Sequence, residues 1–460
     1  MSSIWTPDIE NPEGPVYVAI LQALEEDIVS GNLRPGDRLP THRKLANQLG
    51  LAIGTVTKAY REAERQGLIR GDGRRGTFVG QYRRRPETLL TRSTEPGIID
   101  LSPYYPPANA DPDLSHTLSQ LAKHDINYLT RYNTSRGYTR HREAGAKWVA
   151  GLGLKVDEEE VVITAGAQHA TLITLTSCAK RGDVIVSARH TYPGLKWATD
   201  LAGLKLIGIE SDDEGLLPDA LESCCAKHRV RFLYCIPTLD NPTNAIMSES
   251  RRRALADVAE KHGVEIIEDE INRRLVKDPP PLMSSIAPDR TFLIASLSKV
   301  VAGGLRICYL IAPSRYRDRL LRGICSTTLV VAPLMAELAA QWISDGTAER
   351  TVVRKRAEAE KRSRVAVEAL SGLDFNSAPT SYFVWLKLPE RWHPTEFAAE
   401  THRRGVIVAP SDLFAVDSTD IDRAARICLG GHVDLETLER GLKVLASILR
   451  GDTCPESVVF

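Results

Sequence analysis

A chain of 460 residues is long enough for two or three domains, and an apolar fraction of 43% allows a large buried core. The 59 basic and 59 acidic residues cancel, which excludes a chain that is basic throughout but not one with a basic segment. The eight cysteines form no CxxC pair, the N-terminus has no apolar core, and no run of ~20 apolar residues occurs, so we expect no metal site, no signal peptide, no membrane span and a cytoplasmic location.

The first basic segment is residues 34–85, which hold thirteen Arg and Lys against four Asp and Glu. Apolar spacing and glycine stops predict three helices and two short strands, with Thr41 as an N-cap and Gly50 as a stop. The helices span residues 15–30, 41–49 and 54–66, and the strands span 68–70 and 76–79. This order predicts a helix-turn-helix with a wing, whose third helix enters the major groove. The candidate DNA contacts are Thr41, Arg43, Thr55, Thr57, Lys58, Arg61, Arg74 and Arg75.

This segment resembles the GntR-type winged-helix family in Gly31–Pro40 (GNLRPGDRLP), Arg43–Ala46 (RKLA) and Gly76–Val79 (GTFV). The resemblance implies that residues 1–80 form a domain that binds double-stranded DNA. One departure is Ala52-Ile53, which stand where the family commonly has Ser-Arg before its third helix. The missing serine cap costs about 1 kcal/mol of helix stability, and the missing arginine removes a DNA contact.

Residues 81–97 contain two prolines among Arg, Thr, Ser and Glu, which predicts an exposed linker. From residue 98 to 455, short apolar runs alternate with helical patterns, which is typical of an α/β domain with a mainly parallel sheet. A long helical stretch after Pro333 leads to a smaller α+β part over about residues 335–455. The predicted strands are 160–164, 183–187, 205–209, 232–236, 265–268, 292–296, 382–386 and 425–429.

Chemistry based on pyridoxal 5'-phosphate (PLP) needs a lysine for the aldehyde, a carboxylate for the ring nitrogen, phosphate donors and a stacking ring. Ser296-Leu-Ser-Lys299 follows a strand, and Lys299 is the candidate lysine, with a lowered pKa. We expect Ser296, Ser298 and Arg306 to hold phosphate oxygens, together with the backbone amides of Ala167 and Gln168 at a helix start.

Three more candidates lie beyond the ends of predicted strands, where such sheets bind ligands. Asp269 is placed to meet the ring nitrogen, Asn241 to donate to the phenolate oxygen, and Tyr192 to stack on the ring. We expect Lys299, Asp269 and Tyr192 to carry the chemistry.

In this order, these motifs resemble the class I/II aminotransferases of fold type I. The resemblance implies that Tyr132 reaches the phosphate in the partner subunit of a homodimer and that Arg426 binds an α-carboxylate. Asn272 stands where the family usually has a tyrosine that contacts the phenolate oxygen, and its amide can still donate. Thr380-Ser381 replace a frequent Gly-Gly, a departure that narrows the substrate side of the pocket.

A GntR-type winged helix joined to an aminotransferase-like domain is similar to the MocR subfamily of regulators. This implies a DNA-binding transcription regulator that senses PLP, or a small amino compound held as an external aldimine on PLP. Two alternatives stay open. The first is that the chain is a working PLP-dependent aminotransferase. The second is that it senses PLP without an amino effector.

Overall fold

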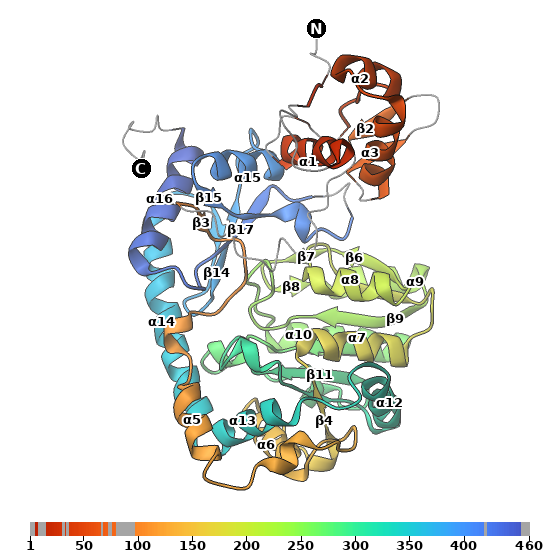
Figure 1. Cartoon of the computed structure of the whole chain (residues 1–460). Helices are drawn as coiled ribbons and strands as arrows, with labels where there is room; N and C mark the ends of the chain where they lie inside the picture. The colour runs from red at the N-terminus through yellow and green to blue at the C-terminus, as the bar shows by residue number, and fades with distance from the viewer. Residues whose placement is uncertain are drawn as a thin grey trace.

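The computed structural model describes residues 5–7, 15–29, 33, 36–65, 68–71, 76–79, 97–417 and 421–451. The candidate contacts Arg74 and Arg75, and residues 81–96 of the predicted linker, lie outside these ranges. Figure 1 shows a red N-terminal module, a large α/β part from orange to teal, and a blue C-terminal part. No helix within the described ranges is both long and apolar enough to cross a bilayer.

The N-terminal module has the three predicted helices and both predicted strands, as α1 (Val16–Val29), α2 (His42–Leu49), α3 (Ile53–Arg65), β1 (Ile69–Gly71) and β2 (Thr77–Val79). The Thr41 side chain accepts the Lys44 amide, and Gly50 ends α2 with a positive φ of 64°, a conformation that glycine adopts without strain. β1 and β2 pair antiparallel, and the backbone at Leu39 bonds to Thr77 on the other side of β2. The helices pack on one apolar core.

The large part is built on a seven-stranded sheet in the order β4-β12-β11-β10-β9-β5-β6. All neighbouring strands are parallel except β12, which runs antiparallel to both β11 and β4, so the expected mainly parallel sheet is confirmed. The strands are β4 (Val161–Thr164), β5 (Val184–Ala188), β6 (Lys205–Ile209), β9 (Val230–Cys235), β10 (Glu265–Asp269), β11 (Thr291–Ser296) and β12 (Cys308–Ile311). A small hairpin adds β7 (Ser211–Asp212) and β8 (Gly215–Leu216).

Helices cover both faces of this sheet, which is why its central strands read as continuous apolar runs. One face packs against α7 (Ala167–Cys178), α8 (Pro193–Leu201) and α12 (Arg317–Thr327). The other packs against α6 (Thr139–Ala150), α9 (Pro218–Lys227), α10 (Glu249–His262), α11 (Met283–Ile286) and α13 (Pro333–Ser344). A further helix, α5 (Leu114–Leu121), adds Leu121 to the same core as α6 and α13.

The smaller part is an antiparallel sheet in the order β13-β14-β17-β16, covered by helices. Its elements are α14 (Thr347–Ala369), β13 (Phe375–Asn376), β14 (Phe383–Lys387), α15 (Pro394–Arg403), β15 (Val406–Ile407), β16 (Ala409–Pro410), β17 (Ala424–Cys428) and α16 (Leu435–Arg450). The strand β3 (Ile99–Asp100) comes from the other end of the domain but pairs with β15 and packs on this core. The smaller part is therefore assembled from both ends of the domain.

Candidate functional site

The candidate residues collect at one edge of the large sheet. Asp269 ends β10, Lys299 follows β11, and Asn241 lies in the turn after β9, all at the carboxyl ends of parallel strands. Arg426 reaches this edge from β17 of the smaller part, where it bonds Asn241. The site is therefore built between the two parts of the domain.

Lys299 is partly buried and its amine is held by Tyr104. The Lys299 Nζ donates to the Tyr104 carbonyl and lies 3.9 Å from the centre of the Tyr104 ring. Burial, helped by the positive charge of Arg426, lowers the pKa of Lys299 to about 7. A substantial share of this amine is therefore neutral near pH 7, the form that attacks an aldehyde.

Asp269 is a buried carboxylate with two partners. Its Oδ2 accepts the Tyr234 hydroxyl at 2.9 Å, and its Oδ1 accepts the Ile271 amide at 3.3 Å. Burial raises the pKa of Asp269 to about 6, because the charged form is desolvated. A protonated ring nitrogen would favour the charged carboxylate again, as the predicted role requires.

Tyr192 lies at the start of α8, beside Gly194. A Cβ on Gly194 would come within 2.3 Å of the Tyr192 ring, so glycine is needed for this ring to pack here. Burial first, and then the negative charge of Asp269, raises the pKa of Tyr192 to about 12. The predicted stacking residue and the predicted carboxylate are thus close enough to interact.

The predicted phosphate ligands also come together. Ser298 Oγ lies 3.2 Å from Ser296 Oγ and 3.5 Å from Arg306 Nη1. Arg306 lies over Gly166, where an added Cβ would be 2.4 Å from its Nη2 and where φ is 90°, so only glycine fits.

Gly166 immediately precedes α7, whose first amides belong to Ala167 and Gln168. Helix-start amides lack helical partners and attract anions. Two hydroxyls, a guanidinium and a helix start form a cradle that fits a phosphate dianion. The residues present therefore fit PLP.

Arg426 is buried, with 4% of its surface exposed. Its Nη1 donates to Asn241 Oδ1 at 2.7 Å and its Nη2 to the Ser102 carbonyl at 2.9 Å. Its Nε is buried and has no hydrogen-bond partner within the described residues. A buried cation with an unfilled donor fits an anionic ligand group such as a carboxylate.

Both the oxygen and the nitrogen of the Asn272 side-chain amide form hydrogen bonds. Its Oδ1 accepts the Tyr104 hydroxyl at 2.5 Å, and its Nδ2 donates to the Leu239 carbonyl at 2.8 Å. One N–H of this amide is left for the predicted contact with the cofactor. The tyrosine hydroxyl that this position lacks is thus supplied next to it by Tyr104.

Two other residues with a role predicted from the sequence are Tyr132 and Ser381. Tyr132 is 89% exposed, so within a single chain it lies outside the buried cluster. Ser381 is buried and donates to Asn244 Oδ1 at 2.6 Å, which ties the loop after β9 to the smaller part. Ser381 therefore helps to hold the loop after β9 in position.

Sequence reasoning did not find Tyr104, Ser102 or Tyr234. Tyr104 and Ser102 lie in an irregular segment about 170–320 residues away from their partners in the chain, and no motif marks them. Tyr234 sits in an apolar run that reads as plain core. For Tyr234 alone a signal was available, namely a side chain with a polar hydroxyl one residue before the end of a buried strand.

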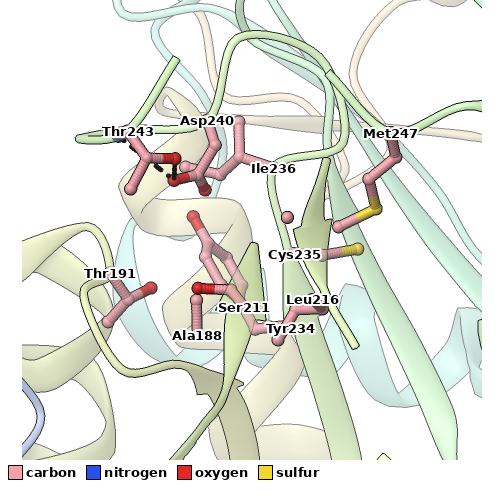
Figure 2. A pocket seen from close by; sticks show the side chains of 11 residues that line it. Ala188, Thr191, Ser211, Leu216, Tyr234, Cys235, Ile236, Asp240, Thr243 and Met247 are labelled. Atoms are coloured by element: carbon pink, nitrogen blue, oxygen red, sulfur yellow. Dashed lines mark hydrogen bonds between the residues drawn. The ribbon is translucent and has the colours of Figure 1, made fainter. Parts of the chain in front are cut away.

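A pocket adjoins this cluster on the side of β9 (Figure 2). Its lining includes Tyr234, Asp240 and Thr243, and Thr243 Oγ1 donates to Asp240 Oδ2 at 2.7 Å. Burial raises the pKa of Asp240 to about 6. Because the Tyr234 ring lines the pocket while its hydroxyl reaches Asp269, this residue connects the pocket to the predicted site.

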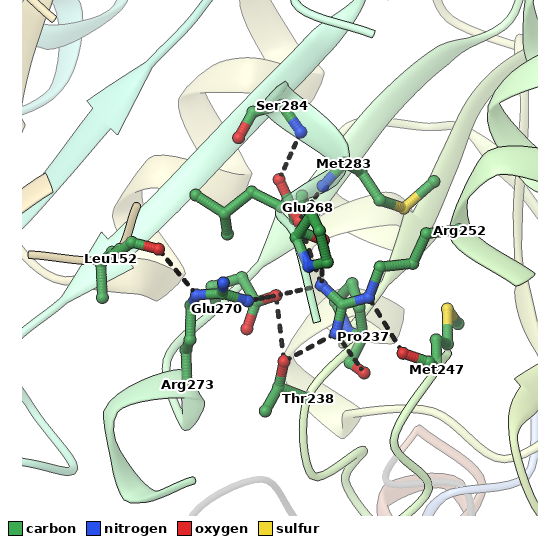
Figure 3. A network of polar contacts seen from close by, with 12 residues as sticks. Leu152, Pro237, Thr238, Met247, Arg252, Glu268, Glu270, Arg273, Met283 and Ser284 are labelled. Atoms are coloured by element: carbon green, nitrogen blue, oxygen red, sulfur yellow. Dashed lines mark hydrogen bonds and ion pairs between the residues drawn. The ribbon is translucent and has the colours of Figure 1, made fainter. Parts of the chain in front are cut away.

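The residues on either side of Asp269 belong to a separate polar network (Figure 3). Arg252 donates to Glu270 Oε1 at 2.9 Å, to Thr238 Oγ1 at 2.9 Å and to backbone carbonyls. Glu268 accepts the backbone amides of Met283 and Ser284. Side chains alternate between the two faces of a strand, so this network and Asp269 lie on opposite faces of β10.

Five of the eight candidate DNA contacts lie on α2 and α3. Arg43, Lys58 and Arg61 are exposed, whereas Thr55 and Thr57 are half-buried. Thr57 Oγ1 lies 3.2 Å from His42 Nδ1, and Lys58 Nζ lies 3.9 Å from the centre of the Tyr17 ring. Thr57 and Lys58 thus make contacts inside the domain, and Arg43 and Arg61 are the more available pair.

Comparisons with known proteins agree for both halves of the chain. Residues 97–445 match the aminotransferase class I and II family, and residues 16–79 match the gntR family of bacterial regulatory proteins. The chain is 32% identical to YdeF of Bacillus subtilis, an uncharacterised HTH-type transcriptional regulator, over 97% of this chain and 96% of YdeF. It is 27% identical to PdxR of Corynebacterium glutamicum, an HTH-type pyridoxine biosynthesis transcriptional regulator, over 79% of this chain and 81% of PdxR.

Solved structures give the same fold for the larger half. An archaeal alanine:glyoxylate aminotransferase superimposes with a TM-score of 0.73 at 25% identity, over 77% of this chain and 91% of that one. The kynurenine aminotransferase of Pyrococcus horikoshii, solved with PMP, superimposes with a TM-score of 0.72 at 22% identity, over 81% and 98%. The second likeness concerns the fold alone.

Proposed function

The chain belongs to the aminotransferase class I and II family and carries a GntR-type DNA-binding domain before it, as MocR regulators do, and from this premise we propose that it is a transcription regulator that responds to PLP and to an amino compound. The observation that carries the proposal is the cluster of half-buried Lys299 with buried Asp269 and Arg426 in a chain that also has a winged helix. The proposed division is residues 1–80, a linker at 81–97, and residues 98–455.

The proposed roles follow from the contacts of each side chain. When bound, PLP supplies an aldehyde for a primary amine and a ring that accepts electrons. Lys299 offers the amine and Asp269 the carboxylate for the ring nitrogen. The first turn of α7, Ser296, Ser298 and Arg306 hold the phosphate. Asn241 and Asn272 supply amide donors, and Tyr192 stacks.

Arg426 is proposed to select a carboxylate. Its unfilled Nε supports an amino compound that carries a carboxylate group, since a guanidinium binds such a group with two parallel hydrogen bonds. That group would take over donors that now go to Asn241 and Ser102. The smaller part, which bears Arg426, is then drawn toward the large part.

We also propose a homodimer and a cytoplasmic location. The exposed Tyr132 supports the dimer, because it fits a residue that acts on a partner subunit. A DNA-binding domain supports a location with the chromosome.

The test is fluorescence anisotropy with DNA from upstream of this protein's gene, at a stated salt concentration because phosphate contacts make affinity salt-dependent. We expect binding that exceeds binding to unrelated DNA and that changes when PLP, or PLP with one amino acid of a panel, is added. No preference for this DNA under any condition would contradict the proposal.

A working aminotransferase is the second candidate. It is favoured by the Lys299 amine, because a pKa of about 7 suits a group that takes and gives protons near neutral pH. Steady formation of a keto acid from an amino donor would support it. A lasting absorbance change without turnover would support sensing instead.

A further inference from the structure

Residues 99–108, which we call the strap, lie along the smaller part. The amides of Ile99 and Leu101 donate to the carbonyls of Gly405 and Ile407. The Leu101 carbonyl accepts the Cys428 amide at 2.7 Å. The strap is thus fastened to β15 and to the end of β17.

The strap also remains attached further along. The Gly431 amide donates to the Pro106 carbonyl at 3.3 Å. A Cβ on Gly430 would meet the Tyr105 carbonyl oxygen at 1.9 Å, so the two backbones touch and leave no room for a side chain. Any movement of the smaller part therefore moves the strap.

Two strap carbonyls accept hydrogen bonds from two of the basic side chains of the site. The Ser102 carbonyl accepts Arg426 Nη2 at 2.9 Å, and the Tyr104 carbonyl accepts Lys299 Nζ. These are the amine and the guanidinium that the proposed function assigns to an aldehyde and a carboxylate. A ligand that uses both groups must take them from the strap.

Tyr104 links the strap to the large part. Its hydroxyl donates to Asn272 Oδ1 at 2.5 Å, and its ring packs 5.1 Å from the Phe383 ring in β14. One side chain therefore contacts the Lys299 amine, the Asn272 amide and the smaller part.

The strap is continuous with the chain that leads to the winged helix. Residue 97 begins the described part of the domain, and the GntR-type match ends at residue 79. Fewer than 20 residues separate the two, a short connection by which a displaced strap can act on the DNA-binding domain.

We propose that Tyr104 is the positioning residue that couples the occupied site to DNA binding, through its hold on Lys299 and Asn272. This inference rests on the proposed regulator function and adds the element that transmits the signal. Ligand binding between Lys299 and Arg426 displaces the strap carbonyls and releases Tyr104. The strap then moves with the smaller part and alters the position of the winged helices.

Two variants separate the contacts of Tyr104. Tyr104→Phe keeps the ring and the carbonyl at Lys299 but removes the hydroxyl that reaches Asn272. Tyr104→Ala also removes the ring and lets water reach the Lys299 amine. Tyr128→Phe is the matched control, since its hydroxyl donates to Glu337 at 3.3 Å, away from this cluster.

The first measurement is the rate of PLP uptake against pH, followed by absorbance with the full chain. Burial is the largest cause of the lowered pKa of Lys299, so we expect the midpoint to rise in Tyr104→Ala and to stay unchanged in Tyr104→Phe and Tyr128→Phe. An unchanged midpoint in Tyr104→Ala would show that the Tyr104 ring does not shield the Lys299 amine. The groups that face Lys299 and set the midpoint with it are Tyr104, Arg426, Cys428, Arg306 and Asp269.

The second measurement is the ratio of DNA dissociation constants with and without saturating PLP. We expect about fivefold or more for wild type and Tyr128→Phe, a reduced ratio for Tyr104→Phe, and a ratio near one for Tyr104→Ala. If the Tyr104 variants bind PLP and keep the wild-type ratio, the proposed role of Tyr104 is wrong. If Tyr104→Ala does not fold, the result for Tyr104→Phe alone tests this role. A ratio of one in wild type for PLP and for every amino acid added with it would instead contradict the proposed function itself.

Discussion

Two clusters of buried charge lie on opposite faces of β10, and they differ in how far the hydrogen bonds of their guanidinium groups are satisfied. Around Arg252, every guanidinium nitrogen has an acceptor, and Glu268 accepts two backbone amides (Figure 3). Around Asp269, Arg426 keeps a buried Nε without a partner among the described residues. Burial raises a carboxyl pKa in both clusters, that of Glu268 in the first and that of Asp269 in the second, so the contrast lies in the two guanidinium groups. The Arg252 guanidinium is satisfied within the chain, although Glu270 Oε2 has no hydrogen-bond partner among the described residues, whereas the Arg426 guanidinium keeps a donor for a ligand.

The contrast teaches how to separate structural from functional charge in one sheet. Removing a buried guanidinium whose nitrogens are all paired leaves its partner carboxylate poorly compensated and costs stability. A cluster with spare donors costs stability as it stands and regains it on binding.

The largest expected effect is on stability. Arg252→Ala removes the cation that lies 2.9 Å from Glu270 and 3.8 Å from Glu268, and it leaves Glu270 only the longer pair with Arg273 at 3.4 Å. We therefore expect the free energy of unfolding to fall by about 3–5 kcal/mol. Denaturant unfolding of the PLP-free chain measures this. Arg253→Ala is the control, because Arg253 forms an exposed pair with Glu249 and should change stability by under about 0.5 kcal/mol. Equal effects of the two changes would contradict the comparison.

The second prediction concerns the incomplete cluster. Arg426→Gln removes a buried cation whose bonds are not all filled, so unfolding should change by less than about 1 kcal/mol. The variant should also need about 10-fold to 100-fold more of the responding amino acid to change the absorbance of bound PLP, because it loses a charged hydrogen-bonded pair with the ligand. Arg423→Gln changes an exposed arginine three residues away and serves as the control. If Arg426→Gln lowers stability strongly and leaves the response to the amino acid unchanged, Arg426 has a structural role like that of Arg252.

The third prediction uses pH. The pKa of Lys299 is lowered to about 7, so its neutral, reactive fraction rises as pH increases through that value. We expect the rate of PLP uptake to increase by about tenfold from pH 6 to pH 8. Stopped-flow absorbance measures it, and a midpoint near the ordinary lysine value would mean that burial does not act on this amine.

The smallest expected effect concerns Tyr234. Its hydrogen bond lowers the pKa of Asp269 against the effect of burial, so Tyr234→Phe should raise that pKa above about 6. Less of the carboxylate is then charged at pH 7, and PLP affinity should fall by a few-fold, the value of one hydrogen bond. The dissociation constant for PLP at pH 7 and pH 8 measures this, and the loss should be smaller at pH 8. No difference between the two pH values would exclude Asp269 as the group that titrates.

Much of this architecture could be predicted from the sequence because it depends on local patterns. Thr41 and Gly50 mark the ends of α2 through backbone geometry alone. The phosphate residues Ser296, Ser298 and Arg306 lie within eleven residues, so one motif contains them.

The contacts that sequence missed are long-range. Tyr104 meets Asn272 across 168 residues, and Ser102 meets Arg426 across 324. Nothing near these residues in the chain indicates their partners, since the pairing depends on how β3 packs against β15. The antiparallel direction of β12 was not predicted for a similar reason, because an apolar run in the sequence does not show which way its strand will run.

The central claim is that Lys299 connects PLP to DNA binding, and the most direct test is the DNA dissociation constant of wild type and Lys299→Ala, each with and without PLP. The account predicts a change of about fivefold or more for wild type and none for Lys299→Ala, with equal DNA affinity of the two in the absence of PLP. An equal response of both proteins to PLP would contradict it.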